Sequence, residues 1–432
     1  MSNSIINIIK KKHLCLLVLL TLLAGCGNAP GSSGREDSGA LTPGMTASEA
    51  APGSARTAVP ASEAAPTSAP VLSPTPSPAP SPTPAPEITL VMIGDILQHT
   101  RVAESGITET GEYDFTRIFE HVREEVSRAD LALVNQEVII GGRELGISGY
   151  PCFNAPYELG DALAEAGFDV VLHATNHALD KDRRGVENCL AFWRQSYPGI
   201  GVLGIHDSQE NQQEIYVWEE QGIRLAILNY TYGTNGIPMP ADMPYAVDML
   251  ERERVAEDLQ KAQELADMVI VCPHWGTEYV LEQTAQQEEW AEFLAENGAD
   301  LILGTHPHVI EPVQWVTADN GNRALVYYSL GNFVNWTSGT GKGVANRMVG
   351  AMAQVTITLD AEGEAVISRY AAEPLVCHVE EGWGGVTVYP LEEYTEELAS
   401  RNRIVSQDAD FSLEYCQKLA EKVFGEKSEF NE

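Results

Sequence analysis

The sequence predicts an α/β fold whose sheet is covered by helices on both faces. Three times along the chain, an amphipathic helical segment ends at a Gly or Asp and is followed by a short apolar strand. The strands are continuous runs of Val, Ile and Leu, which is typical of strands buried on both faces. Helices that alternate with such strands indicate βα units and therefore the α/β class.

The first 26 residues form a predicted export signal. Lysines at positions 10–12 precede the apolar run Leu14 to Leu23, which is too short to span a bilayer comfortably. The run closes on LLAGC, and small residues directly before Cys26 resemble a bacterial lipoprotein signal. Diacylation of Cys26 would make the protein extracytoplasmic and anchor it by lipid to the bacterial plasma membrane. The alternative is an ordinary cleaved signal peptide with an incidental cysteine.

Residues 27–86 are predicted to form a disordered, extended linker. More than half of the 24 prolines lie there, among Ser, Thr, Ala and Gly. Such a composition cannot bury a core and favours a solvated tether. From residue 87 onward the chain is long enough for a large core, and we expect one domain over 87–336.

The three helical segments justify the βα reading one by one. Residues 157–169 carry apolar residues at helical spacing and stop at Gly167, as helix C-termini commonly do. Residues 252–267 repeat the pattern before an apolar strand. Residues 286–300 repeat it again and end at Asn297-Gly298.

Six apolar strands end in polar residues. Ligand sites of α/β sheets lie beyond the carboxyl ends of the strands, so side chains far apart in the sequence can converge there. The six ends are VMIGD at Asp95, LALVNQE at Glu137, VVLHATNH at His177, VIVCPHWG at His274, LILGTHPH at His308 and LVYYSLGN at Asn332.

Three of these ends carry histidine and two carry a carboxylate. Neutral imidazole is the commonest transition-metal ligand, and Pro307 would hold His306 and His308 in a turn. Each residue alone has an ordinary alternative: Asp95 as a helix N-cap, Glu137 facing water on an edge strand, or histidines exposed on a loop. Their coincidence at strand ends favours one shared metal site.

The charge excludes one class of partner. The formal net charge is −35 at pH 7, and binding to nucleic acid phosphates needs the opposite sign. Beyond Cys15 and Cys26, five cysteines remain at irregular spacing, which indicates neither a disulfide framework nor a CxxC metal site.

Six motifs follow one another along the chain: GD at 94–95, NQE at 135–137, TNHALD at 175–180, HWGTEY at 274–279, GTHPHV at 304–309 and YSLGNFV at 328–334. Their order resembles the CapA-type capsule synthesis family, which is associated with poly-γ-glutamate production and is similar to calcineurin-like metallophosphoesterases. The resemblance covers about residues 88–336. It implies a two-sheet sandwich flanked by helices (α/β/β/α, metallophosphatase-like) with a metal centre at one edge.

The resemblance also implies roles for single residues. The implied metal ligands are Asp95, Glu137, Asn176, His274, His306 and His308, with Glu137 or else Asn135 as a metal-bridging residue. His177 resembles the leaving-group acid or phosphate contact, and Asp180 is the nearby acidic residue, so these two are the catalytic candidates. Glu278 is expected to orient His274, or to be an exposed charge. Asn332 is expected to bind substrate or a ligand, or to satisfy a buried turn.

Two departures bear on the number of metal ions. Leu97 stands where the phosphoesterases have a histidine, and Ala178 directly follows the Asn-His pair where they have an acidic residue. One of two metal sites would then be incomplete unless His99 or Gln98 substitutes. We therefore expect one or two divalent ions, of Mn, Fe or Zn.

The implied function is metal-dependent hydrolysis by a surface-anchored protein of capsule synthesis. Its expected partners are an anionic polymer such as poly-γ-glutamate, or another small anionic substrate, together with the membrane and a membrane capsule-synthesis complex. One alternative is a non-catalytic accessory that binds capsule polymer during assembly and export. The other is a cell-surface phosphodiesterase or nucleotidase.

The C-terminal region, 337–432, is expected to complete the same domain. Two strands joined by a turn at Asp360–Gly363 are expected to complete the second sheet. A terminal helix follows, with Leu413, Cys416 and Leu419 facing inward. The glycine-rich segment Trp336–Gly343 lacks the spacing of a P-loop and is expected to be a lid or a linker.

Overall fold

The structure is a computed structural model that describes residues 86–425 and 429–431. The predicted signal sequence with Cys26 and almost all of the predicted linker lie outside the described residues. Among the residues described, no helix combines the length and the apolarity needed to cross a membrane. The boundaries predicted at residues 26 and 86 stay predictions.

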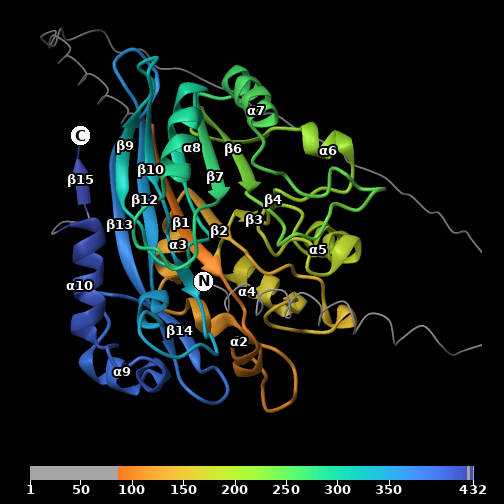
Figure 1. Cartoon of the computed structure of the whole chain (residues 1–432). Coiled ribbons are helices and arrows are strands. Elements are labelled where there is room, and N and C mark those ends of the chain that lie inside the picture. Colours follow the sequence, from red (N-terminus) through yellow and green to blue (C-terminus); the bar gives the residue numbers. More distant parts are fainter. Residues whose placement is uncertain (1–85, 426–428, 432) are drawn as a thin grey trace, which may run out of the picture. The chain divides into compact units, whose positions relative to one another are not determined.

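Two sheets form the centre of the fold (Figure 1). The first contains, in spatial order, β14 (Val386–Pro390), β13 (Ala365–Val379), β12 (Val349–Leu359), β1 (Glu87–Ile96), β2 (Leu131–Asn135), β3 (Val170–Leu172) and β4 (Gly201–Leu203), with β11 (Asn332–Val334) paired to β1 and β15 (Glu429–Asn431) paired to β13. The second contains β5 (Tyr216–Glu220), β6 (Ile223–Thr231), β7 (Met268–His274), β8 (Leu301–Leu303), β10 (Arg323–Tyr327) and β9 (Val313–Thr317).

Helices connect the parallel strands and cover the sheets. The longer ones are α4 (Tyr157–Ala166), α5 (Asp182–Ser196), α7 (Arg252–Leu265), α8 (Ala285–Glu296) and α10 (Leu413–Phe424). The shorter ones are α2 (Thr100–Ser105), α3 (Arg123–Arg128), α6 (Gln209–Gln213) and α9 (Glu396–Arg401). The helix α4 ends where Gly167 adopts φ +102°, the left-handed conformation that glycine tolerates, as predicted.

The core explains why the two sheets stack. Along β6, Leu225 and Ile227 pack into a large cluster with residues of the first sheet, whereas Ala226 and Leu228 pack against α7 and α8. Alternate side chains of one strand thus face opposite layers. The hydroxyl of Tyr327 on β10 also donates to the Ala371 carbonyl on β13, at 2.7 Å. The predicted two-sheet α/β sandwich with flanking helices is confirmed.

The C-terminal strands correct one expectation. The strands β12 and β13 form the predicted hairpin, and Gly363 donates its N–H to the Asp360 carbonyl in the turn. They extend the first sheet rather than the second, because β12 pairs antiparallel with β1 along Glu87 to Ile93. This pairing satisfies the edge of β1 that β2 leaves open. In the terminal helix Cys416 and Leu419 are buried, and Leu413 is half-buried against the core.

The segment Trp336–Gly343 is tied to the C-terminal region. Gln407 donates to the carbonyls of Thr337 and Gly339 and accepts from the N–H of Gly341. Asp408, which is 5% exposed, accepts from the N–H of Gly343 and of Ala345. These bonds attach the segment, which was expected to be a lid or a linker, to the C-terminal region.

Candidate metal centre

The polar residues that follow the strands meet at one edge, where both sheets contribute. Asp95, Glu137 and Asn176 come from the ends of β1, β2 and β3 of the first sheet. His274 ends β7, and the turn with His306 and His308 follows β8 of the second sheet. All six side chains are 3% exposed or less. The sequence-based expectation that these distant residues converge at strand ends is met.

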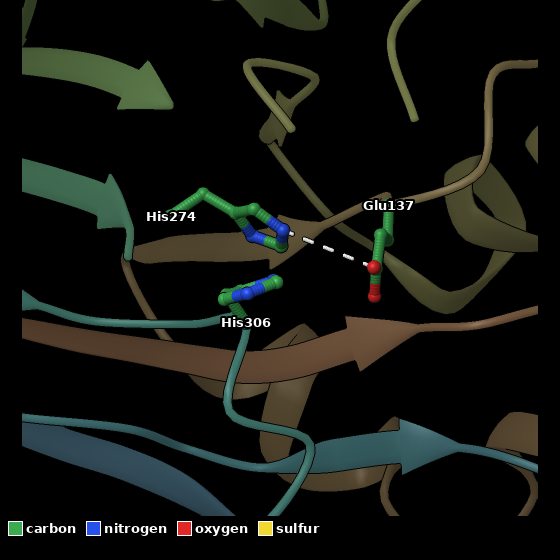
Figure 2. Close-up of side chains that lie close together, drawn as sticks. All are labelled: Glu137, His274 and His306. Atoms are coloured by element: carbon green, nitrogen blue, oxygen red, sulfur yellow. Dashed lines mark ion pairs between the residues drawn. The ribbon is translucent and has the colours of Figure 1, made fainter. Parts of the chain in front are cut away.

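Two groups of three ligand atoms form around Glu137. One group is Glu137, His274 and His306, whose ligand atoms lie within 4.8 Å of one another, and Figure 2 shows these side chains pointing together. The other is Asp95, Glu137 and His308. Glu137 Oε1 lies 3.8 Å from His274 Nε2 and 3.6 Å from His308 Nε2. Glu137 is therefore common to both groups, and the family resemblance implied a metal-bridging role for it or else for Asn135.

The His306–His308 turn has an unusual backbone. His306 has φ +101° and His308 has φ +60°, in a region that side chains other than glycine rarely adopt. Backbone strain of this kind persists only where surrounding contacts enforce it and is common at functional sites. Here the N–H of Tyr279 donates to the Pro307 carbonyl at 2.7 Å, and Asn332 Nδ2 donates to the His308 carbonyl at 3.1 Å. Asn332 thus satisfies the buried turn.

Asp95 links the two sheets. Asn135 Nδ2 donates to Asp95 Oδ1 at 2.8 Å, while Asp95 Oδ2 lies 3.1 Å from His308 Nδ1 and 3.4 Å from the His306 backbone nitrogen. The strand ends approach so closely that a Cβ added to Gly94 would lie 2.0 Å from the Gly331 carbonyl oxygen. The glycine before Asp95 is therefore required by packing.

His274 is oriented by residues of its own neighbourhood. Its Nδ1 lies 3.0 Å from Thr305 Oγ1, and its Nε2 lies 2.9 Å from Asn176 Oδ1. Glu278, expected either to orient this ring or to be an exposed charge, is exposed. Thr305 supports the ring, because it pairs with His274 in a parallel bridge just beyond the end of β8.

His177 and Asp180 form a pair beside the two groups. His177 Nδ1 lies 2.6 Å from Asp180 Oδ2, which also accepts the N–H of Phe153. Asn235 Nδ2 lies 3.4 Å from the same ring nitrogen. Within the described part of the chain, His177 Nε2 makes no hydrogen bond. The pair therefore fixes the ring and leaves Nε2 available.

The side chains fit a divalent cation. Both carboxylate oxygens of Glu137, His306 Nδ1, Asn135 Oδ1 and the whole amide of Gln98 are buried without a hydrogen-bond partner among the described residues. Leaving buried polar atoms unsatisfied costs about 1–3 kcal/mol each, so such a cluster calls for a ligand. Carboxylate, imidazole and amide oxygen donors suit Mn, Fe or Zn. These groups could bind a metal whose identity the residues leave open.

Burial and charge set the protonation of these groups. Burial raises the pKa of Glu137 well above its ordinary value. Burial, and then the neighbouring histidines, lower the pKa values of His274 and His306. Burial also lowers the pKa of His308, but the charges of Glu137 and Asp95 outweigh it and raise this pKa to about 9. Neutral His274 and His306 have the protonation state that a metal ligand needs.

His99 and Gln98 are the two residues that could replace the histidine missing at Leu97. Leu97 is buried, and His99 packs edge-on against Phe153 at 5.3 Å between ring centroids. His99 belongs to neither group of ligand atoms. The unpartnered amide of Gln98 keeps that residue as a candidate.

Several residues of the site were not found from the sequence. Thr305 supports His274, and exposed Tyr232, Asn235 and Tyr279 form a rim around the buried ligands. The Tyr232 ring lies 4.5 Å from that of His306 and the Tyr279 ring 5.9 Å from that of His308. Thr305 stands inside the GTHPH motif and could have been included. Tyr232 and Asn235 follow β6, a strand that the sequence reading missed.

Comparison with known proteins adds family information. Residues 89–337, more than half of the chain, match the family described as bacterial capsule synthesis protein PGA_cap. The chain is 28% identical over 264 residues to capsule biosynthesis protein CapA of Bacillus anthracis, covering 58% of this chain and 61% of that protein. It is 30% identical over 189 residues to PGA biosynthesis protein CapA of Bacillus subtilis strain 168, covering 40% and 45%. The chain thus matches less than two thirds of the length of either relative.

Solved structures show a distant likeness. The calcineurin-like phosphoesterase YfkN from Bacillus subtilis is 13% identical with a TM-score of 0.41, covering 79% of this chain and 97% of that chain. A putative 5′-nucleotidase from Staphylococcus aureus is 13% identical with a TM-score of 0.42, covering 78% and 58%. Likeness at this level does not bear on activity.

Proposed function

The chain belongs to the bacterial capsule synthesis family, and on that premise we propose that it is a metal-dependent hydrolase of poly-γ-glutamate capsule synthesis. Its substrate is an anionic molecule, either the capsule polymer itself or a small anionic compound. Hydrolysis occurs at an acyl or a phosphoryl group. The whole length of the curated relatives is not matched, so their activity and partners come to this chain only as part of this proposal.

The observation that carries the proposal is the environment of Glu137. Its carboxylate is fully buried, belongs to both groups of ligand atoms and has no hydrogen-bond partner for either oxygen within the described residues. A buried carboxylate without a donor is strongly unfavourable unless a cation or a proton neutralises it. Two histidine-containing groups that share this carboxylate support a metal centre better than a structural ion pair.

Six residues would hold the metal ion and Asn135 would position one of them. Asp95, Glu137, Asn176, His274, His306 and His308 would hold the ion. When bound, a divalent ion lowers the pKa of a water molecule and polarises the oxygen of the bond to be broken. Asn135 keeps Asp95 in place through its hydrogen bond of 2.8 Å.

His177 would act as the proton donor to the leaving group. Its Nδ1 hydrogen bond to Asp180 keeps the imidazole in one orientation. The proton on Nε2 is then the one transferred, because Nδ1 is held by the carboxylate. A positioned acid of this kind contributes about 10²–10⁴-fold to a rate.

The test is metal content and turnover of the full chain, purified with detergent. Wild-type protein, His274→Ala and the control His121→Ala would be assayed with a model phosphodiester and with a γ-glutamyl peptide. His121 stacks on Tyr389 outside the site, so its loss should leave both metal content and turnover unchanged. Metal-dependent hydrolysis that His274→Ala abolishes supports the proposal, and the substrate that is cleaved assigns the acyl or phosphoryl reaction.

Two other outcomes assign the rival functions. Bound metal without turnover of either substrate indicates a non-catalytic accessory that binds capsule polymer. Turnover of the phosphodiester alone, in a strain whose capsule is unaffected by His274→Ala, indicates a cell-surface phosphodiesterase or nucleotidase.

Surface anchoring completes the proposal. The motif LLAGC, which ends at Cys26, supports lipidation. The Pro-rich segment that follows supports a tether to the outer face of the plasma membrane, beside membrane proteins of capsule synthesis. Cys26→Ala should release the protein from the membrane fraction into the medium or leave its precursor unprocessed. Membrane retention of a normally processed Cys26→Ala protein would contradict the anchor.

A further inference from the structure

We propose that Arg347 is the residue that binds the anionic group of the substrate, a carboxylate or a phosphate, beside the candidate metal centre. The inference rests on the proposed function, since it names a substrate-binding residue of the same site. Arg347 lies in the short 3₁₀ helix Ala345–Met348, beyond the part of the chain that matches the family.

Arg347 is attached to the His306–His308 turn at both its backbone and its side chain. Asn332 Nδ2 donates to the Arg347 carbonyl and to the His308 carbonyl, each at 3.1 Å. The Arg347 guanidinium carbon lies 3.5 Å from the centroid of the Tyr279 ring. Tyr279 in turn donates its N–H to the Pro307 carbonyl and packs its ring 5.9 Å from that of His308. Two independent routes therefore place this guanidinium at the rim of the metal centre.

The guanidinium is available to a ligand. Within the described residues it forms no ion pair and donates no hydrogen bond, and its Nε is buried without a partner. Many arginines of this chain behave differently: Arg143, Arg224 and Arg254 each pair with a nearby carboxylate. In a chain with 62 acidic and 27 basic residues, an arginine without an acidic partner beside a metal site is conspicuous. A buried guanidinium nitrogen without an acceptor is unfavourable until an anion reaches it.

The position of Arg347 is fixed before any ligand arrives. Asp408 accepts the N–H groups of Gly343 and Ala345, which set the turn into the 3₁₀ helix. The Tyr279 ring, 3.5 Å from the guanidinium carbon, restrains the guanidinium. A planar, preorganised fork of this kind matches the two oxygens of a carboxylate or a phosphate. It also offsets the acidic surroundings, which would otherwise repel an anionic substrate.

The test compares anion binding by calorimetry in the full chain, with and without Mn²⁺. The probes are inorganic phosphate and γ-glutamylglutamate, which separate the two sources of the anion. The variants are Arg347→Gln, Arg347→Lys and the control Arg323→Gln, which removes a guanidinium stacked 4.6 Å from the Trp315 ring at the far end of β10. Mn²⁺ affinity is measured separately for each protein.

We expect wild type and Arg323→Gln to bind at least one probe equally. Arg347→Gln should bind it at least about tenfold more weakly, and Arg347→Lys should lie between because it keeps the charge but not the fork. Mn²⁺ affinity should be the same in all four proteins. Equal probe affinity in wild type and Arg347→Gln, or no binding of either probe by wild type, would overturn the inference. Absence of Mn²⁺ binding by wild type would instead overturn the proposed function, and the metal-free titrations would still decide the role of Arg347.

Discussion

Replacing Glu137 with Gln removes the group that both sets of ligand atoms share. The substitution keeps the size of the side chain but takes away its charge. Burial raises the pKa of Glu137, because the ionised carboxylate is less stable in the folded than in the unfolded protein. This cost lowers the free energy of unfolding above the ordinary pKa of the group and disappears as the pH falls below it. We therefore expect the metal-free variant to be at least as stable as wild type at pH 7, with no such advantage at pH 4.

In the presence of metal, binding should stabilise wild type much more than Glu137→Gln. At an Mn²⁺ concentration 100 times its Kd, binding stabilises wild type by about 2.7 kcal/mol. Unfolding entropy of about 2.1 cal/mol/K per residue gives about 0.7 kcal/mol/K for roughly 350 residues, so Tm should rise by about 4 °C. Loss of a residue that only supports a ligand costs about 10–100-fold in affinity, and loss of a shared ligand should cost at least the upper figure. The variant would then gain about 0.4 kcal/mol, a rise of less than about 1 °C.

The assay is differential scanning calorimetry of the full chain with and without Mn²⁺. Glu278→Gln is the matched control, because it removes the same charge from an exposed residue of the neighbouring HWGTEY segment. The control should keep the full rise in Tm. A rise of the same size in Glu137→Gln as in wild type would refute the argument that Glu137 holds the ion.

Three further predictions concern the pH dependence of metal binding, the orientation of His177 and the hydrogen bonds of Asp408. Since ion binding displaces the proton of His308, whose pKa is about 9, Mn²⁺ affinity should rise about tenfold per pH unit between pH 7 and 8.5; a flat calorimetric profile would count against this ligand. Asp180→Asn should leave Mn²⁺ affinity unchanged but lower kcat by about 10²-fold or more, because His177 loses its orienting carboxylate. An unchanged kcat would show that His177 is not the general acid. Asp408→Ala should destabilise the protein by about 2–4 kcal/mol in urea unfolding, since two backbone N–H groups lose a charged acceptor. The control Asp410→Ala, at an exposed residue, should change the free energy of unfolding by less than about 0.5 kcal/mol. Similar values for both would disprove the anchoring role of Asp408.

The sequence carries the local part of the fold well. The stop at Gly167 and the apolar runs that end at Asp95 and His274 follow from glycine chemistry and from burial, which act over a few residues. The convergence of strand ends could also be anticipated, because it follows from the topology of α/β sheets. The assignment of single residues as metal ligands came instead from the resemblance to the capsule synthesis family.

What the sequence did not disclose depends on contacts between distant segments. The sequence of the hairpin formed by β12 and β13 does not indicate that it pairs with β1 rather than with the second sheet. The open edge of β1 and an edge strand of the second sheet could each accept an amphipathic strand. The support of His274 by Thr305 and the position of Arg347 at the site both follow from tertiary packing. The left-handed backbone at His306 is likewise enforced by its surroundings and has no local signal.

The most direct measurement is anomalous X-ray diffraction from crystals of the protein soaked in Mn²⁺. We predict anomalous density in contact with Glu137 and with at least two of His274, His306 and His308. Density elsewhere with none at Glu137, or no density at Mn²⁺ concentrations that saturate the protein in solution, would contradict a metal centre built on that carboxylate.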